Sequence, residues 1–102
     1  MAPVNVAQEV RHYILVILNI AGVTGASDKL ISTSLTKIGL AVSTSDLEVQ
    51  LGYLKEKGYV SYEEVKDRHT KISRKIAKIS ASGIDLMEGN IDPDPGIGLF
   101  QG

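Results

Sequence analysis

The chain has 102 residues and a formal net charge of −1, with 43% hydrophobic and 23% charged residues, which suits one soluble domain around one hydrophobic core. It contains no cysteine, so disulfides and thiolate chemistry are excluded and a cytoplasmic location is expected. The apolar run 13–20 is shorter than the roughly 20 residues that span a bilayer, and no basic segment precedes it. We therefore expect neither a membrane helix nor a signal peptide.

The first predicted element is a helix over residues 6–21. Apolar side chains recur there at helical spacing and form one continuous stripe. The members of the stripe are Val6, Val10, Tyr13, Ile14, Ile17, Leu18 and Ala21. Asn5 is the predicted N-cap and Gly22 the predicted end. Leu15 lies off the stripe, so we interpret it as an isolated surface residue, with a homodimer contact as the alternative.

A second helix is predicted after a short loop. Ser27 or Asp28 can cap it, and its apolar spacing continues to about Ile38. Gly39 ends it. A minimal β-strand is expected over residues 40–42, between the second and third helices.

The third predicted helix continues to Lys57, where Gly58 supplies a left-handed stop. It buries three leucines at helical spacing. Its start offers two overlapping caps, of which the second matches the capping box. These caps are Ser43 with Asp46, and Ser45 with Glu48.

A β-hairpin follows the third helix. Residues 59–66 are predicted as a strand, 67–70 as the tip and 71–80 as the returning strand, because β-branched and aromatic residues are frequent there. The earlier isoleucines of the returning strand are out of phase with Ile79. We therefore expect a β-bulge near residues 74–78.

The hairpin also carries the strongest charge asymmetry of the chain. Residues 66–78 contain six cations and one anion, whereas residues 1–65 and 79–102 each carry net negative charge. Because the pI of the whole chain is near 6.1, any nucleic-acid binding must be local to this segment. The alternative is a solvated hairpin whose lysines only protect exposed strand edges. Both interpretations remain open.

A short fourth helix is predicted at about residues 81–88, followed by a tail of different composition. The last twelve residues contain two prolines and three glycines. We therefore predict a folded domain over residues 1–89 and an extended tail over residues 90–102. Apolar tail residues such as Ile97 and Phe100 indicate that the tail packs on its own domain or on a second subunit.

The third helix and the strand after it resemble winged-helix regulators of the MarR, PadR and ArsR type. The matching spacing is Leu47-x3-Leu51-x2-Leu54-x3-Gly58-Tyr59-Val60, and the opening of the post-wing helix matches in Ile79-Ser80-Ala81-Ser82-Gly83. The stretches DLEVQLGYLKEKGYV and GNIDPDPGI are similar to small uncharacterised winged-helix proteins of Mu-like prophages. The resemblance implies an α+β, mainly helical fold: a winged helix-turn-helix with a three-helix bundle, a two- or three-stranded β-wing and a short C-terminal helix.

The resemblance also implies a phage-type transcriptional regulator that binds double-stranded DNA. We expect a homodimer, formed through the first helix and the C-terminal segment. The third helix would lie in the major groove and the wing on the backbone. The implied groove-facing positions are Ser43, Thr44, Ser45, Asp46, Val49, Gln50 and Tyr53. The implied wing contacts are Arg68, His69, Lys71, Arg74 and Lys75. Only Gln50 is of a type that usually reads bases, so a backbone grip is better supported than sequence readout.

The alternative function is a protein-interaction or assembly module, with Val49, Gly52 and Tyr53 as its contact face. A glycine in mid-helix costs about 1 kcal/mol relative to alanine, which would suit the close approach of DNA or of a partner helix. We expect no enzyme, because no nucleophile elbow and no phosphate-cradling glycine loop occurs. The two histidines lack carboxylates at metal-ligand spacing, so neither a metal nor a cofactor is expected, and no effector is indicated.

Overall fold

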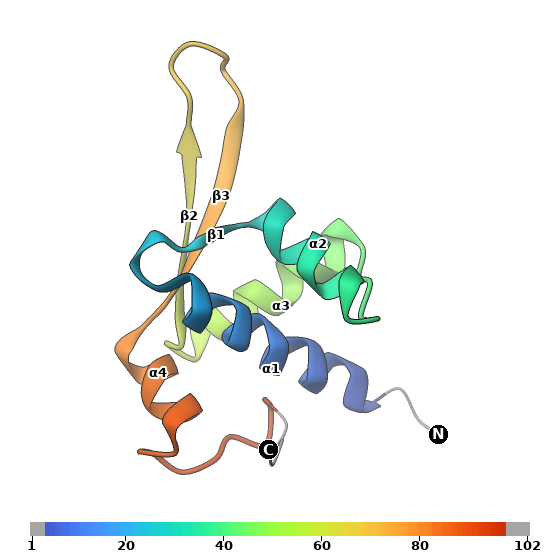
Figure 1. Ribbon diagram of the computed structural model, residues 1–102, viewed down its shortest axis with the longest axis vertical. Helices are drawn as coiled ribbons and strands as arrows, with labels where there is room; N and C mark the ends of the chain where they lie inside the picture. Colours follow the sequence, from blue (N-terminus) through green and yellow to red (C-terminus); the bar gives the residue numbers. More distant parts are fainter. Residues whose placement is uncertain (1–3, 98–102) are drawn as a thin grey trace.

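The computed structural model describes residues 4–97. Its elements are α1 (Val4–Ala21), a 3-10 turn η1 (Gly22–Thr24), β1 (Ala26–Ser27), α2 (Asp28–Lys37), α3 (Thr44–Glu56), β2 (Val60–Lys66), β3 (Ser73–Ile79) and α4 (Ala81–Glu88). Figure 1 shows a helical body from which the β2–β3 hairpin projects. The three strands form one antiparallel sheet in the order β1-β3-β2. This is the mainly helical α+β winged-helix architecture that the sequence predicts.

The core is organised around α1. This helix contacts α2, α3, α4 and β3, and four of its side chains, those of Val10, Ile14, Leu15 and Leu18, are at most 1% exposed. The interpretation of Leu15 as a surface residue was therefore wrong, because the helix has neighbours on more than one side. The helix also begins at Val4, so Asn5 lies inside it rather than at its N-cap.

Residues 6–24, which comprise most of α1 and the turn η1, are long and apolar enough to cross a membrane by length and composition alone. The same test is passed by the central helix of many water-soluble cores. Here four apolar side chains of α1, those of Val10, Ile14, Leu15 and Leu18, join residues of α2, α3 and the sheet in one buried cluster, whereas Ile20 is 82% exposed. We therefore interpret α1 as the core helix of this domain.

Serine side chains are the N-caps of α2 and α3. Ser27 caps α2, in agreement with one of the two predicted candidates. Ser43 caps α3, because its Oγ accepts the N–H of Asp46 at 3.1 Å. The predicted capping box of Ser45 with Glu48 was wrong: α3 begins at residue 44, so Ser45 already lies in the first helical turn.

The two long strands pair in register over their whole length. The bulge predicted near residues 74–78 does not occur in this ladder, which lies within the described residues. The change of phase has another cause. Side chains alternate across a strand. Ala77 and Ile79 belong to the core cluster, whereas Ile76, which lies between Ala77 and Lys75, is on the opposite face and lines a surface groove of the wing.

The third strand lies elsewhere than predicted. Residues 40–42 form no regular element, and β1 instead precedes α2 and pairs with Ala77 and Ile76 of β3. Gly25 permits this pairing, since its φ is 73° and a Cβ atom there would collide with the carbonyl oxygen of Ala77. A two-residue strand has no periodicity of its own, so only its partner defines it.

Candidate nucleic-acid interface

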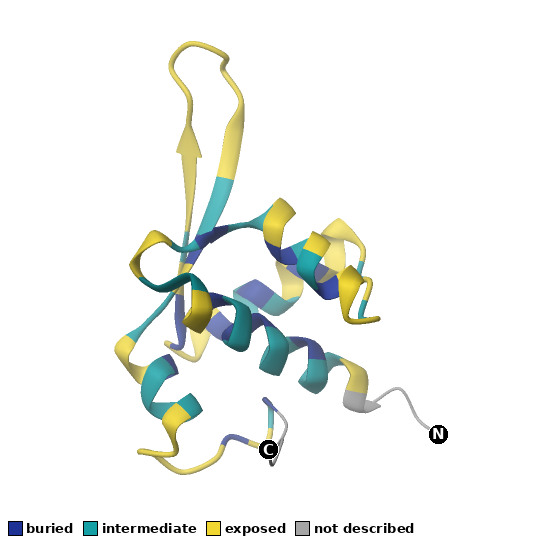
Figure 2. Cartoon of the chain, in the orientation of Figure 1, coloured by how far each residue is buried: buried dark blue, intermediate teal, exposed yellow. Residues whose placement is uncertain are grey.

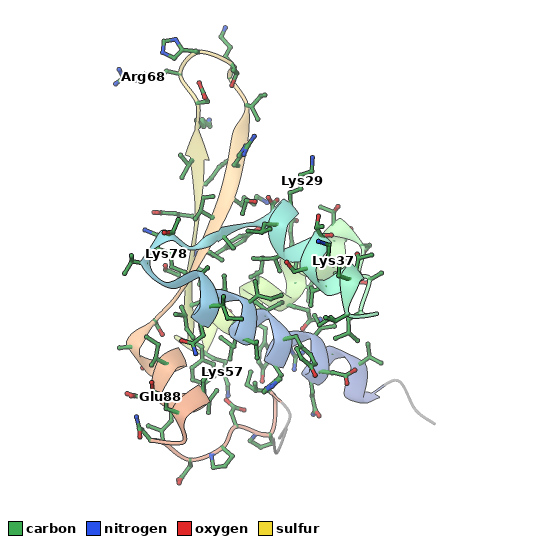
Figure 3. All side chains as sticks on the ribbon, viewed as in Figure 1. Lys29, Lys37, Lys57, Arg68, Lys78 and Glu88 are labelled. Carbon is green, nitrogen blue, oxygen red and sulfur yellow. The ribbon has the colours of Figure 1, made fainter. Side chains whose placement is uncertain are left out.

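The distal wing, residues 63–74, is exposed at every position, as Figure 2 shows. It contains Lys66, Arg68, Lys71 and Arg74 against three carboxylates, of which Glu63 and Glu64 lie at its base. Figure 3 places Arg68 at the tip, far from the helical body. The hairpin therefore carries its cations away from the acidic remainder of the chain.

Asp67 shapes the turn at the tip. Its Oδ1 accepts the N–H groups of His69 at 2.7 Å and of Thr70 at 3.1 Å. These hydrogen bonds lower the pKa of Asp67, so the carboxylate stays ionised. Lys71, which follows, has a φ of 58°, so its backbone adopts the left-handed conformation that reverses the chain at the tip. The only anion of the tip is thus occupied by the backbone, while Arg68, His69 and Lys71 are exposed to solvent.

Lys75, the fifth predicted wing contact, is held by α3 instead. Its Nζ lies 2.5 Å from the Oε1 of Glu48, and Glu64 is its directly opposite neighbour on β2. The hydrogen bond to Glu48 raises the pKa of Lys75. Among the described residues Lys75 is the only wing cation in a direct ion pair, so its charge is already balanced.

One face of the distal wing is a shallow groove of about 710 Å³ that combines apolar and basic side chains. Val65 is 50% exposed and Ile72 is 54% exposed, and Lys66, Arg68 and Arg74 line the same groove. Cations paired with small apolar side chains can contact phosphates and deoxyribose together. The groove therefore places positive charge next to exposed apolar surface, with Asp67 as the one carboxylate in its lining.

Lys29 is a basic residue that sequence reasoning missed. It lies in the first turn of α2 and lines a second groove, of about 540 Å³, together with Leu30, Ile72 and Arg74. Figure 3 shows its side chain directed toward the side of the wing. No local pattern links Lys29 to the hairpin, since its position follows from the pairing of β1 with β3.

The start of α3 is open to solvent. The predicted contact residues there that are exposed are Ser43, Thr44, Ser45, Asp46 and Val49. Three of them offer hydroxyl groups, and the Val49 side chain is 63% exposed. Hydroxyls can contact phosphates and an exposed valine can contact a thymine methyl group. The same turn carries the acidic Asp46 and no cation, so its electrostatic attraction for DNA is small.

Gln50 and Tyr53, the other two predicted contacts of α3, lie against α1 and away from the open start of α3. The Nε of Arg11 in α1 donates to the Oε1 of Gln50 at 2.6 Å, and the Arg11 guanidinium lies 3.8 Å from the centre of the Tyr53 ring. The Nη1 of Arg11 also donates to the carbonyl of Gly96 at 2.8 Å. The structure thus places the only predicted base reader against α1 and the C-terminal segment, rather than beside the wing.

The described part of the tail packs on its own domain. Ile97 is 3% exposed and Asp94 is 9% exposed. Burial alone would raise the pKa of Asp94, but hydrogen bonds from Tyr59 and the backbone, together with Lys57, outweigh it and the pKa is lowered. Burial and the Asp94 hydrogen bond raise the pKa of Tyr59 to about 12. Phe100 lies outside the described residues, and the boundary at residue 89 stays a prediction.

Metal chemistry has no visible site here. Within residues 4–97, no group of three or more His, Asp or Glu side chains could hold a metal ion. His69 lies at the wing tip, and His12 is a half-buried residue of α1 whose pKa is lowered by burial.

Comparison with known proteins supports the architecture. No protein-family model matches the sequence, and no curated protein matches it either. A solved structure described as a "PadR-like Transcription factor from bacteroid fragilis" is similar, with a TM-score of 0.68 and 23% sequence identity. The match covers 82% of this chain and 78% of that chain. At this level of identity the likeness shows the fold, which is that of a winged-helix protein.

Proposed function

We propose that the protein binds duplex DNA chiefly by gripping its phosphate backbone with the distal wing. The observation that carries this proposal is the placement of Lys66, Arg68, Lys71 and Arg74 on an exposed, projecting hairpin of an otherwise acidic chain. Cations that neutralise phosphates release condensed counterions, and this term supplies most non-specific affinity for DNA.

The exposed first turn of α3 would face the major groove beside this grip, with Ser43, Thr44, Ser45 and Val49 as its contacts. The similar PadR-like protein is a transcription factor by its description, and we extend that role to this chain as part of the proposal. The resemblance to prophage proteins would make it a phage-type regulator. The lack of cysteine suits action in the cytoplasm, and a homodimer is part of the same proposal.

The test is a titration with generic duplex DNA at several salt concentrations. It compares the wild-type chain with an Arg68→Ala/Lys71→Ala variant. The wild type should bind more weakly as salt rises. The variant should lose affinity at low salt, and the log–log slope should become shallower by roughly 1.8, because each phosphate contact contributes about 0.9.

A charge-matched control separates the wing from net charge. The Lys37→Ala/Lys78→Ala variant removes two exposed cations from α2 and from the base of β3, and Figure 3 shows both residues away from the tip. This control should keep the wild-type slope. If both variants lose affinity equally, the wing has no special role, and if the wild type does not bind at low salt the proposal fails.

A second candidate function is a protein-interaction module. The observation that favours it is a shallow, open depression of about 730 Å³ on α3, which is lined by Val49, Gly52, Tyr53, Lys55 and Glu56. An exposed valine beside a glycine suits contact with another helix. A wild-type chain that ignores DNA at low salt would favour this second function.

A further inference from the structure

Residues 94–97 form a compact turn of sequence Asp-Pro-Gly-Ile. The N–H of Ile97 donates to the carbonyl of Asp94 at 3.0 Å, and the N–H of Gly96 donates to the Oδ1 of Asp94 at 2.8 Å. Aspartate in the first position and proline in the second favour such turns, because the carboxylate accepts a backbone N–H and the ring fixes φ. The turn thus holds its shape largely through its own bonds.

The domain recognises the carboxylate of this turn. The hydroxyl of Tyr59 donates to the Oδ2 of Asp94 at 2.7 Å, and the Nζ of Lys57 lies 3.0 Å from the same oxygen. Hydrogen bonds to an ionised group are stronger than neutral ones. The site therefore selects an acidic residue in the first position of the turn.

The domain also selects the third position. A Cβ atom on Gly96 would collide with the hydroxyl of Tyr53, and the Gly96 carbonyl accepts the hydrogen bond from Arg11. Gly96 is not among the glycines with positive φ. Space, rather than backbone conformation, therefore favours a glycine here, because a larger residue would displace the Tyr53 ring from its contact with Arg11.

The fourth position is selected by burial, since Ile97 is 3% exposed and belongs to the hydrophobic core cluster. In contrast, residues 89–93, which connect α4 to the turn, are all exposed. Figure 1 shows this connection running below the helical body from α4 back toward α1. The turn can therefore leave its place without unfolding a helix.

We propose that Arg11, Tyr53, Lys57 and Tyr59 form a recognition site for an Asp-Pro-Gly-aliphatic turn, and that the turn of a second copy of this chain is its exchangeable ligand. In the single chain the site is filled by the chain's own turn. Exchange between two copies remakes the same contacts, so its balance depends on the effective concentration that the linker provides, about millimolar for short flexible linkers. Reciprocal exchange joins two chains around a two-fold axis.

The first test uses a labelled peptide of residues 91–97 and the full-length Gly96→Ala variant. The substitution drives the chain's own turn against Tyr53 but leaves the four site residues unchanged. The variant should bind the peptide at least tenfold more tightly than the wild type, whose own turn competes. A matched peptide that carries Gly96→Ala should bind neither protein, because its methyl group meets the same hydroxyl.

Equal binding of the two peptides by the folded variant would overturn the recognition site. If the variant does not fold, the two peptides are instead added at millimolar concentration to the wild-type chain and followed by NMR. The native peptide should shift the resonances of the Tyr53 and Tyr59 rings in a saturable way, and the Gly96→Ala peptide should not. The second-copy exchange has its own readout. The wild type should form dimers as its concentration approaches millimolar, and a strictly monomeric chain at that concentration would overturn the exchange.

Discussion

At the scale of single residues, the pair of Glu48 and Lys75 controls how much of the wing's charge is available. Lys75 lies where β3 leaves the helical body, and its Nζ is already bonded to the Glu48 carboxylate. A phosphate that approached α3 would compete with Glu48 for this ammonium group. Glu48 also adds an unfavourable negative charge at the surface that we assign to DNA.

The Glu48→Gln variant should therefore bind DNA more tightly than the wild type. Lys75 becomes available for one more phosphate contact, so the log–log salt slope should steepen by about 0.9. Measurement of affinity at several salt concentrations checks this. The double variant Glu48→Gln/Lys75→Ala is the control, and a steeper slope in that variant as well would assign the effect to the lost Glu48 charge instead. Stability should change little, because this pair is exposed.

The second prediction at this scale concerns Asp94 and how the stability of the fold depends on pH. Its pKa in the folded chain lies below the ordinary value of 3.8. A lowered folded-state pKa gives stability that is present above the unfolded pKa and is lost as the pH falls through the folded pKa. The Asp94→Asn variant should therefore be less stable than the wild type by about 2 kcal/mol at pH 7, and this difference should shrink below pH 4.

Denaturant unfolding at several pH values measures that difference. The matched control is Asp92→Asn, which changes the exposed aspartate of the preceding Asp-Pro dipeptide and should leave the free energy of unfolding almost unchanged. A difference between Asp94→Asn and wild type that is the same at pH 7 and pH 3 would contradict the role given to the ionised carboxylate.

At the scale of elements, α3 contains a glycine that no neighbour requires. A Cβ atom on Gly52 would meet nothing within 4 Å, and the residue lies in the middle of the helix. The Gly52→Ala variant should be more stable by about 1 kcal/mol, because alanine has the higher helix propensity. Thermal or denaturant unfolding measures the gain.

The same variant tests what approaches α3. If the wing provides most of the DNA affinity, Gly52→Ala should bind DNA as the wild type does. A tenfold or greater loss of affinity would instead show that a backbone approaches Gly52 closely. The control is Val49→Ala, which shortens an exposed side chain of the same helix. Its DNA affinity shows the effect of a small change on this surface that adds no side chain at Gly52.

The elements also show how far local sequence patterns reach. Helical spacing and serine caps predicted the helices to within a few residues, because those signals act within one turn of chain. β1 and the burial of Leu15 escaped prediction because distant neighbours define them. For the same reason the wing was predicted as a basic hairpin, whereas the bond from Arg11 to Gln50, across 39 residues, left no local signal.

At the scale of the whole molecule, charge is separated along the longest axis. The chain extends over 44 × 31 × 22 Å, and Figure 3 shows Arg68 at one end and Glu88 at the other. Residues 79–102 carry four anions and no cation. Such a distribution orients a protein in the field of a polyanion, so the wing would meet DNA first and the acidic end would point away.

The C-terminal segment contributes to the stability of the whole domain, and its removal is the last prediction. A chain that ends at Asn90 loses the buried Ile97 side chain, worth about 1.5–3 kcal/mol, and the hydrogen bonds of Asp94, Gly96 and Arg11. Domains of this size have only about 5–15 kcal/mol of stability. A loss of about 3 kcal/mol should therefore lower the midpoint of thermal unfolding by roughly 12–24 °C.

A chain that ends at Ile97 is the matched control, because it keeps every tail contact that the structure describes. It should unfold near the wild-type temperature. If both truncated chains unfold together, well below the wild type, residues 98–102 supply the stability instead. If neither differs from the wild type, the tail is not part of the folded domain, and the recognition site proposed for its turn loses its basis. The contacts of Asp94 and Ile97 predict the first outcome, since a side chain 3% exposed cannot be removed from a core without cost.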